Sequence, residues 1–119
     1  MTLSGVDHVW FWVTDMDRAV GFYRDALGLE MRMRHEDTWA EFEAGGIRIG
    51  LHGAGDGALV HGGTAVFLAG DLDLAKASLE ERGVAFDHLG EVPGYARYAS
   101  FADPDGNSMQ LIEYARPRT

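Results

Sequence analysis

The feature that most constrains the fold is an internal repeat in the pattern of expected strands and helices. Asp15-Met16-Asp17 lines up with Asp71-Leu72-Asp73 at a shift of 56 residues, 71 − 15. In each half an alternating strand precedes this acidic helix start, and three further strands follow the helix. The repeat therefore predicts an α+β fold of two βαβββ modules, at about 5–53 and 62–115, which form cup-shaped mixed sheets with the helices outside.

The boundaries of the expected elements come from period-two alternation and from helix caps. The first half predicts strands at 6–13, 29–35, 38–42 and 47–52, with a helix that starts after Thr14 and stops at Gly28. The second half predicts strands at 64–69, 84–89, 95–101 and 107–114, with a helix from Asp71 to Gly83. A Gly-rich connector at 53–63 separates the halves, and the 119 residues suit a single domain.

Asp103-Pro104-Asp105-Gly106 predicts a tight turn before the last strand, because Asp, Pro and Gly suit its first, second and fourth positions. In that strand Met109 and Leu111 face one way, whereas Ser108, Gln110 and Ile112 face the other. The turn and the alternation together indicate a hairpin whose second strand has one apolar face and one largely polar face.

The face turned away from the helices is the candidate ligand site. A shift of 56 aligns His8 with Thr64, and Gly46 and Gly106 open the fourth strand of each half, so that Gly50 aligns with Gln110. Alternation collects the following residues on this face: His8, Trp10, Trp12, Arg48, Gly50, His52, Thr64, Ser108 and Gln110. A concave face lined by aromatic rings and a few polar groups is typical of small-molecule sites.

Composition narrows the possible partners. The chain has no cysteine, so disulfides and thiolate-ligated metals are excluded. The formal net charge is −9 without a basic stripe, which argues against a nucleic-acid partner. No apolar run approaches a membrane span and no signal peptide is evident, so we expect a cytoplasmic protein without a membrane partner.

Two passages resemble the vicinal oxygen chelate superfamily, which includes glyoxalase I, bleomycin resistance proteins and extradiol dioxygenases. They are DHVWFWVTDMDRAVGFYRDALGLEM at 7–31 and FADPDGNSMQLIEY at 101–114, and the repeat between them agrees in order and spacing. The resemblance implies the paired βαβββ fold. It does not imply one reaction, because this superfamily contains isomerases, transferases, oxygenases and plain binding proteins.

The resemblance also implies where a divalent metal would bind in glyoxalase-like members: at His8, Gly50, Thr64 and Gln110. His8 matches that set, and Gln110 stands where glutamate is usual. Gly50 has no side chain and Thr64 is a poor ligand at neutral pH. His52, two residues beyond Gly50 on the same face, is either a substitute ligand or a polar wall residue.

We therefore expect a metal-free protein, without a cofactor, that sequesters an aromatic or cationic small molecule. Trp10 and Trp12 would stack on the ligand, whereas Arg48 either clamps an anionic group or, as we favour, pairs with an acidic side chain. The alternative is a lyase, isomerase or dioxygenase that depends on Zn, Ni, Mn or Fe held at His8, His52 and Gln110. The sequence leaves open whether the protein is an enzyme, and the open sheet edges predict a homodimer.

Overall fold

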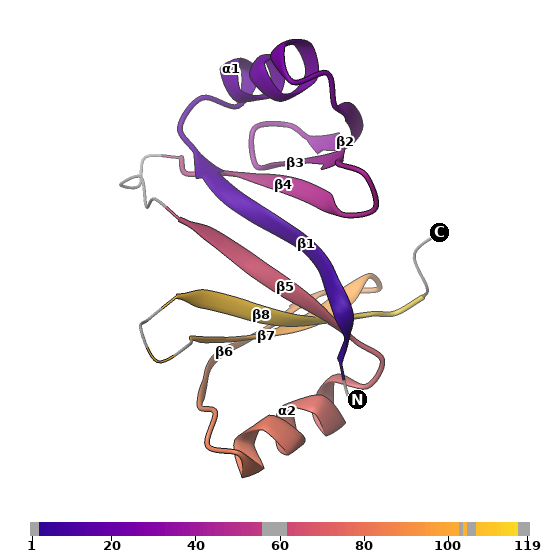
Figure 1. Ribbon diagram of the computed structural model, residues 1–119, viewed down its shortest axis with the longest axis vertical. Helices are drawn as coiled ribbons and strands as arrows, with labels where there is room; N and C mark the ends of the chain where they lie inside the picture. Colours follow the sequence, from indigo (N-terminus) through magenta and orange to yellow (C-terminus); the bar gives the residue numbers. More distant parts are fainter. Residues whose placement is uncertain (1–2, 56–61, 103, 105–106, 117–119) are drawn as a thin grey trace. The chain divides into compact units, whose positions relative to one another are not determined.

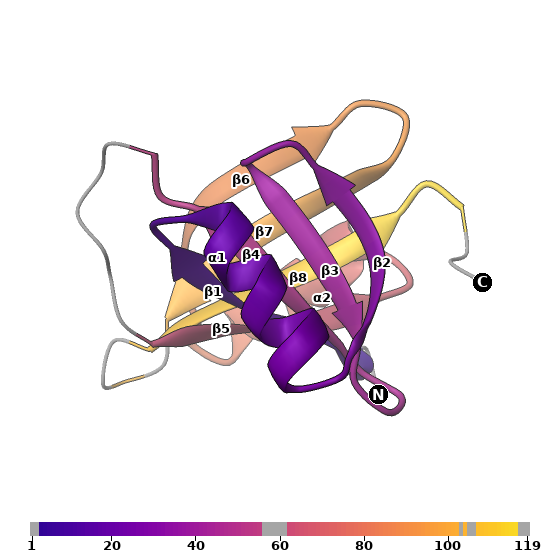
Figure 2. The same cartoon turned by 90° about the horizontal axis from the view of Figure 1, so that it is seen from above.

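The computed structural model describes residues 3–55, 62–102, 104 and 107–116. The first half contains β1 (Leu3–Val13), α1 (Met16–Gly21), the π-helix η1 (Phe22–Ala26), β2 (Glu30–His35), β3 (Trp39–Glu43) and β4 (Arg48–Gly53). The second half contains β5 (Gly63–Ala69), α2 (Leu72–Glu81), β6 (Phe86–Val92), β7 (Ala96–Ala102) and β8 (Ser108–Tyr114) (Figures 1 and 2). The predicted α+β class with mixed sheets is confirmed. The turn expected at 103–106 and most of the connector lie outside the described residues.

The chain divides into two compact units. One unit holds His8–Gly63, and the other holds the residues before His8 together with those from Thr64 onward. The first has the strand order β2-β3-β4-β1, with β4 parallel to β1 and the other neighbours antiparallel. The second has the order β5-β8-β7-β6, with β5 parallel to β8 and the other neighbours antiparallel. Both units therefore use the same connectivity.

Strand register reproduces the repeat. Trp10 of β1 pairs with Gly50 of β4, and Val66 of β5 pairs with Gln110 of β8. The shifts are 66 − 10 = 56 and 110 − 50 = 60, the two shifts that the sequence pattern predicts. Because register decides which side chains share a face, this agreement makes the two halves comparable residue by residue.

Each unit has its own core, on the face of the sheet that its helix covers (Figure 1). In the unit with α1 the buried cluster consists of Met16, Val20, Ala40, Phe42 and Leu51. In the unit with α2 it consists of Ala69, Leu72, Ala75, Ala99 and Leu111. The apolar face assigned from alternation in the fourth strand of each half, with Leu51 and Leu111, is therefore the helix-covered face.

The helices begin at matching aspartates. Asp15 accepts a hydrogen bond from the backbone N–H of Arg18, and Asp71 accepts one from that of Leu74, both at 3.0 Å. Each aspartate has extended backbone angles, as an N-cap residue requires. α2 ends at Glu81, and Gly83 beyond it has a φ of 91°, which lets the Val84 N–H reach the Leu79 carbonyl at 3.1 Å.

The first helix differs from the expected single helix ending at Gly28. α1 continues after Gly21 as the π-helix η1, in which the Leu27 N–H bonds to the Phe22 carbonyl at 3.0 Å. The apolar spacing does not distinguish the two forms, because both place Tyr23 towards the core, where it stacks on Phe42 at 5.5 Å. Neither this helix nor α2 is long and apolar enough to cross a membrane, nor is any other helix among the described residues.

Candidate functional site

The candidate site in the His8–Gly63 unit is built from three rows of side chains across β1, β4 and β3. Register places these rows on the face opposite the α1 core. The rows are His8–Arg48–Glu43, Trp10–Gly50–Glu41 and Trp12–His52–Trp39. We call this surface the tryptophan face, and it contains every tryptophan of the chain.

The rings on the tryptophan face contact one another. The centroid of His52 lies 4.4 Å from that of Trp12, 5.6 Å from that of Trp10 and 5.9 Å from that of Trp39. Trp10 also meets Trp12 edge to face at 5.1 Å. All four rings belong to half-buried residues, whereas Leu51 on the other face is fully buried. The cluster is thus ordered but keeps exposed aromatic surface, as a stacking platform requires.

Trp39 lies over Gly50. A Cβ at position 50 would stand 2.5 Å from Cζ2 of Trp39 and 3.1 Å from Cβ of Trp10, and it would collide with Cη2 of Trp39 as well. A Cβ cannot approach a ring carbon that closely, so the glycine provides the space in which the indole rests. The position where the resemblance places a metal ligand is filled by an aromatic ring from β3.

A buried carboxylate fixes the edge of that indole. Glu41 is 4% exposed and accepts a hydrogen bond from Nε1 of Trp39 at 2.8 Å. Nε of Arg48 lies 3.9 Å from Oε1 of Glu41, so the two charges offset each other. The pairing with an acidic side chain that we favoured for Arg48 is therefore present. Arg48 Nε is itself buried and has no hydrogen-bond acceptor among the described residues.

His8 is 6% exposed, and its ring meets Trp39 edge to face at 5.9 Å. The structure thus brings five of the predicted site residues together on the tryptophan face: His8, Trp10, Trp12, Arg48 and His52.

The other predicted site residues belong to the second unit, where they bond to neighbouring hydroxyls. Thr64 donates to Oγ of Ser108 at 3.1 Å, and Nε2 of Gln110 donates to Oγ of Ser100 at 3.2 Å. They lie on the face of β5 and β8 opposite the α2 core, as alternation predicts.

The residues do not fit the four-ligand metal set that the resemblance implies. Gly50 has no donor atom and lies under Trp39, and the Thr64 hydroxyl is engaged with Ser108. Nowhere in 3–55, 62–102 or 107–116 do three His, Asp or Glu side chains gather as a metal would need. The alternative set of His8, His52 and Gln110 stays a prediction, because its members are divided between the two units.

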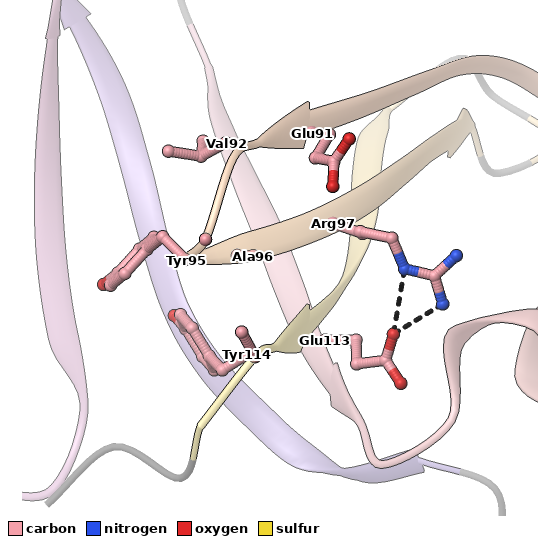
Figure 3. A pocket seen from close by; sticks show the side chains of 9 residues that line it. Glu91, Val92, Tyr95, Ala96, Arg97, Glu113 and Tyr114 are labelled. Carbon is pink, nitrogen blue, oxygen red and sulfur yellow. Dashed lines mark hydrogen bonds and ion pairs between the residues drawn. The ribbon is translucent and has the colours of Figure 1, made fainter.

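A cleft of about 280 Å³ lies in the second unit, near the ends of β7 and β8. Tyr95 and Tyr114 lie on one side of these strands, and Arg97 and Glu113 on the other (Figure 3). Arg97 donates hydrogen bonds to Glu113 at 2.6 Å and to Asp73 of α2 at 3.4 Å. The hydrogen bond to Glu113, and after it the one to Asp73, raises the pKa of the Arg97 guanidinium. These charges join β7, β8 and α2, so we assign the cleft no ligand.

Three members of the tryptophan face were not among the predicted site residues: Trp39, Glu41 and Glu43. In the sequence WAEFE, Ala40 and Phe42 alternate with Glu41, which assigns the odd positions to the face away from the core. That alternation was the available signal. A glutamate in a short strand is ordinarily exposed, so the burial of Glu41 had no signal.

The chain belongs to the Glyoxalase/Bleomycin resistance protein/Dioxygenase superfamily, whose family model matches residues 5–111. The resemblance found in the sequence is thereby confirmed. Among curated proteins, no relative matches the chain.

Solved structures share the fold. Methylmalonyl-CoA epimerase from Mycobacterium tuberculosis has a TM-score of 0.72 and 20% identity, over 97% of this chain and 91% of that one. A superfamily member from Vibrio splendidus has a TM-score of 0.70 and 18% identity, over 94% and 99%. A variant of homoprotocatechuate 2,3-dioxygenase from Brevibacterium fuscum has a TM-score of 0.71 and 20% identity, over 98% of this chain and 34% of that one. Such low identities show the fold and leave the reaction open.

Proposed function

We propose that the protein binds a flat aromatic small molecule, neutral or cationic, on the tryptophan face without a metal ion. The observation that carries the proposal is the cluster of Trp10, Trp12, Trp39 and His52, which is half-buried and packed ring against ring. Its sheet already has a core on the opposite face, with Leu51 and Phe42 fully buried. The rings are therefore not needed to fill that core, and stacking on a ligand would use the surface they keep exposed.

The electrostatics of the face favour an aromatic contact over a charge contact. Glu41 and Arg48 offset each other, so neither offers an uncompensated charge for a ligand. A cationic aromatic ligand remains compatible, because indole faces attract cations and the chain carries a net charge of −9. A purely anionic ligand is disfavoured by the same charge.

Calorimetric titration with a neutral and a cationic aromatic probe, 2-naphthol and 9-aminoacridine, tests the proposal. We expect both to bind, and Trp12→Ala to weaken each by about 1–3 kcal/mol, the cost of removing a buried aromatic anchor. The control is Tyr95→Ala, in the other unit, which should change neither affinity. If the wild-type protein binds neither probe, the proposal is contradicted.

The metal-free part of the proposal has its own measurement. Protein purified without added metal and without a histidine tag should carry less than one equivalent of Zn, Ni, Mn or Fe. One tightly held ion per chain, lost in His8→Ala, would overturn the metal-free function and favour the metal-dependent alternative.

The homodimer also stays a prediction. β2 and β6 are the last strands of the orders found within their units, so each has one side without a strand partner there. Light scattering at micromolar concentration should give twice the 13.0 kDa chain mass, and a clean monomer would contradict it.

A further inference from the structure

We propose that His52 accepts a hydrogen bond from the ligand, so that the ligand is a flat aromatic molecule bearing an O–H or N–H group. The inference rests on the proposed function and narrows its ligand class. It comes from the side chain at the centre of the tryptophan face, whose imidazole is the only ring in the cluster of Trp10, Trp12, Trp39 and His52 that can accept a hydrogen bond. Indoles donate through Nε1 and have no acceptor atom.

The protonation of the neutral His52 ring follows from its backbone partner. Nδ1 of His52 lies 3.0 Å from the carbonyl oxygen of Gly53. A carbonyl oxygen only accepts, so Nδ1 carries the hydrogen, and in the neutral ring the lone pair is on Nε2. Among the residues that the structure describes, Nε2 has no hydrogen-bond partner. An acceptor atom is therefore available on the same face as the exposed indole surface.

The ring is also held in place before any ligand arrives. Trp12 packs on it at 4.4 Å with an interplanar angle of 47°, and Trp10 and Trp39 lie within 6 Å on other sides. Gly53, which supplies the carbonyl, approaches the backbone oxygen of Asp37 so closely that a Cβ would collide with it. The acceptor is thus fixed by three rings and a constrained backbone position, and a ligand would not have to order it.

The two carboxylates on this face already have partners. Glu41 accepts from Nε1 of Trp39 and lies beside Arg48, and Glu43 accepts from the Gly46 N–H at 3.1 Å. A ligand that stacks on the indoles and carries a hydroxyl or ring N–H would therefore donate to His52. Methylation of that group would remove the donor and leave the stacking surface unchanged.

The test compares 2-naphthol with 2-methoxynaphthalene by calorimetric titration of the wild-type protein, His52→Phe and His88→Phe. In the wild type we expect 2-naphthol to bind about three- to tenfold more tightly, as one neutral hydrogen bond predicts. In His52→Phe, which keeps a flat ring, both probes should still bind and the preference should disappear. His88 is exposed and belongs to the second unit, so His88→Phe should keep the wild-type preference.

The outcomes separate the two proposals. If neither probe binds the wild type, both the proposed function and this inference fail. If both bind with equal affinity, or if His52→Phe keeps the preference, only the role of His52 is overturned.

A spectroscopic measurement covers the case in which His52→Phe does not fold. Long-range ¹H–¹⁵N spectra of the wild type should show His52 protonated at Nδ1, and its Nε2 resonance should shift with 2-naphthol but much less with 2-methoxynaphthalene. The opposite tautomer, or equal shifts with both probes, would overturn the assignment.

Discussion

The indole of Trp39 occupies the space above Gly50 that any larger residue would need for its side chain. Gly50 is buried, and its neighbours on β1 and β3, Trp10 and Glu41, both have side chains on the same face. The glycine and the indole are therefore one packing unit, in which the absence of a Cβ on β4 permits the ring from β3. This relationship leads directly to the first prediction.

Gly50→Ala should destabilise the fold by about 1–3 kcal/mol, the usual cost of overpacking a tight site. The new methyl group would push Trp39 away from Glu41, so the tryptophan emission should change with the melting temperature. Gly70→Ala is the matched control, because nothing lies within 4 Å of a Cβ there and its φ is ordinary. An unchanged melt and emission in Gly50→Ala would contradict the packing described.

The two faces of the first unit's sheet should respond differently to truncation. Leu51→Ala removes a fully buried side chain from the α1 core and should cost about 2–5 kcal/mol of unfolding free energy. Trp12→Ala removes a half-buried ring from the tryptophan face and should cost less, while it weakens aromatic binding. Urea unfolding of both variants gives the order, and the reverse order would mean that the indoles are the true core.

The paired helix caps offer a test of the repeat. Asp15→Ala and Asp71→Ala should each lower the free energy of unfolding by about 1 kcal/mol. Each change removes the carboxylate that accepts from the backbone N–H of the third residue of the helix, Arg18 or Leu74. The caps belong to separate units, so the double variant should show the sum of the single effects. A double variant that departs clearly from additivity would show that the caps are energetically coupled.

The ion pairs of Arg97 should rank by geometry. Glu113 is the nearer and less exposed partner, at 2.6 Å and 24% side-chain exposure, against 3.4 Å and 79% for Asp73. Glu113→Gln should therefore lower the melting temperature more than Asp73→Asn does. High salt should reduce both effects, since solvent-exposed pairs are screened. Equal effects at low salt would contradict the ranking.

Much of the fold was predictable because its strands alternate in chemistry as they alternate in space. The faces of His8 and Trp10, of Leu51 and of Gln110 follow from period two, and the aspartate caps follow from the hydrogen bonds that helix starts need. The π-helix at Phe22–Ala26 was not predictable, because its apolar spacing also suits an α-helix over the same residues.

The candidate site was only partly predictable, since the place of Trp39 and the burial of Glu41 depend on packing between strands. Trp39 belongs to the site because β4 has a glycine at position 50, a relationship between residues eleven positions apart (50 − 39). Glu41 is buried beside the indole N–H of Trp39, two residues away on the same strand, and beside Arg48 of the neighbouring strand. Period-two alternation assigns a residue to a face of the sheet. It does not predict whether a residue on the adjacent strand is small enough to leave room for its side chain.

The first strand belongs to both units: residues 3–7 lie with the second unit and 8–13 with the first. Leu3 packs on the core beneath α2, and Asp7 accepts a hydrogen bond from the Tyr114 hydroxyl at 2.6 Å. The repeat in the sequence and the division of the structure therefore differ, because the first module begins at about residue 5 and the first unit begins at His8. A gene fragment beginning at the connector would encode a complete copy of the repeat and an incomplete folding unit. A fragment that encodes the whole second unit would have to join residues 1–7 to the second half, as a circular permutant does.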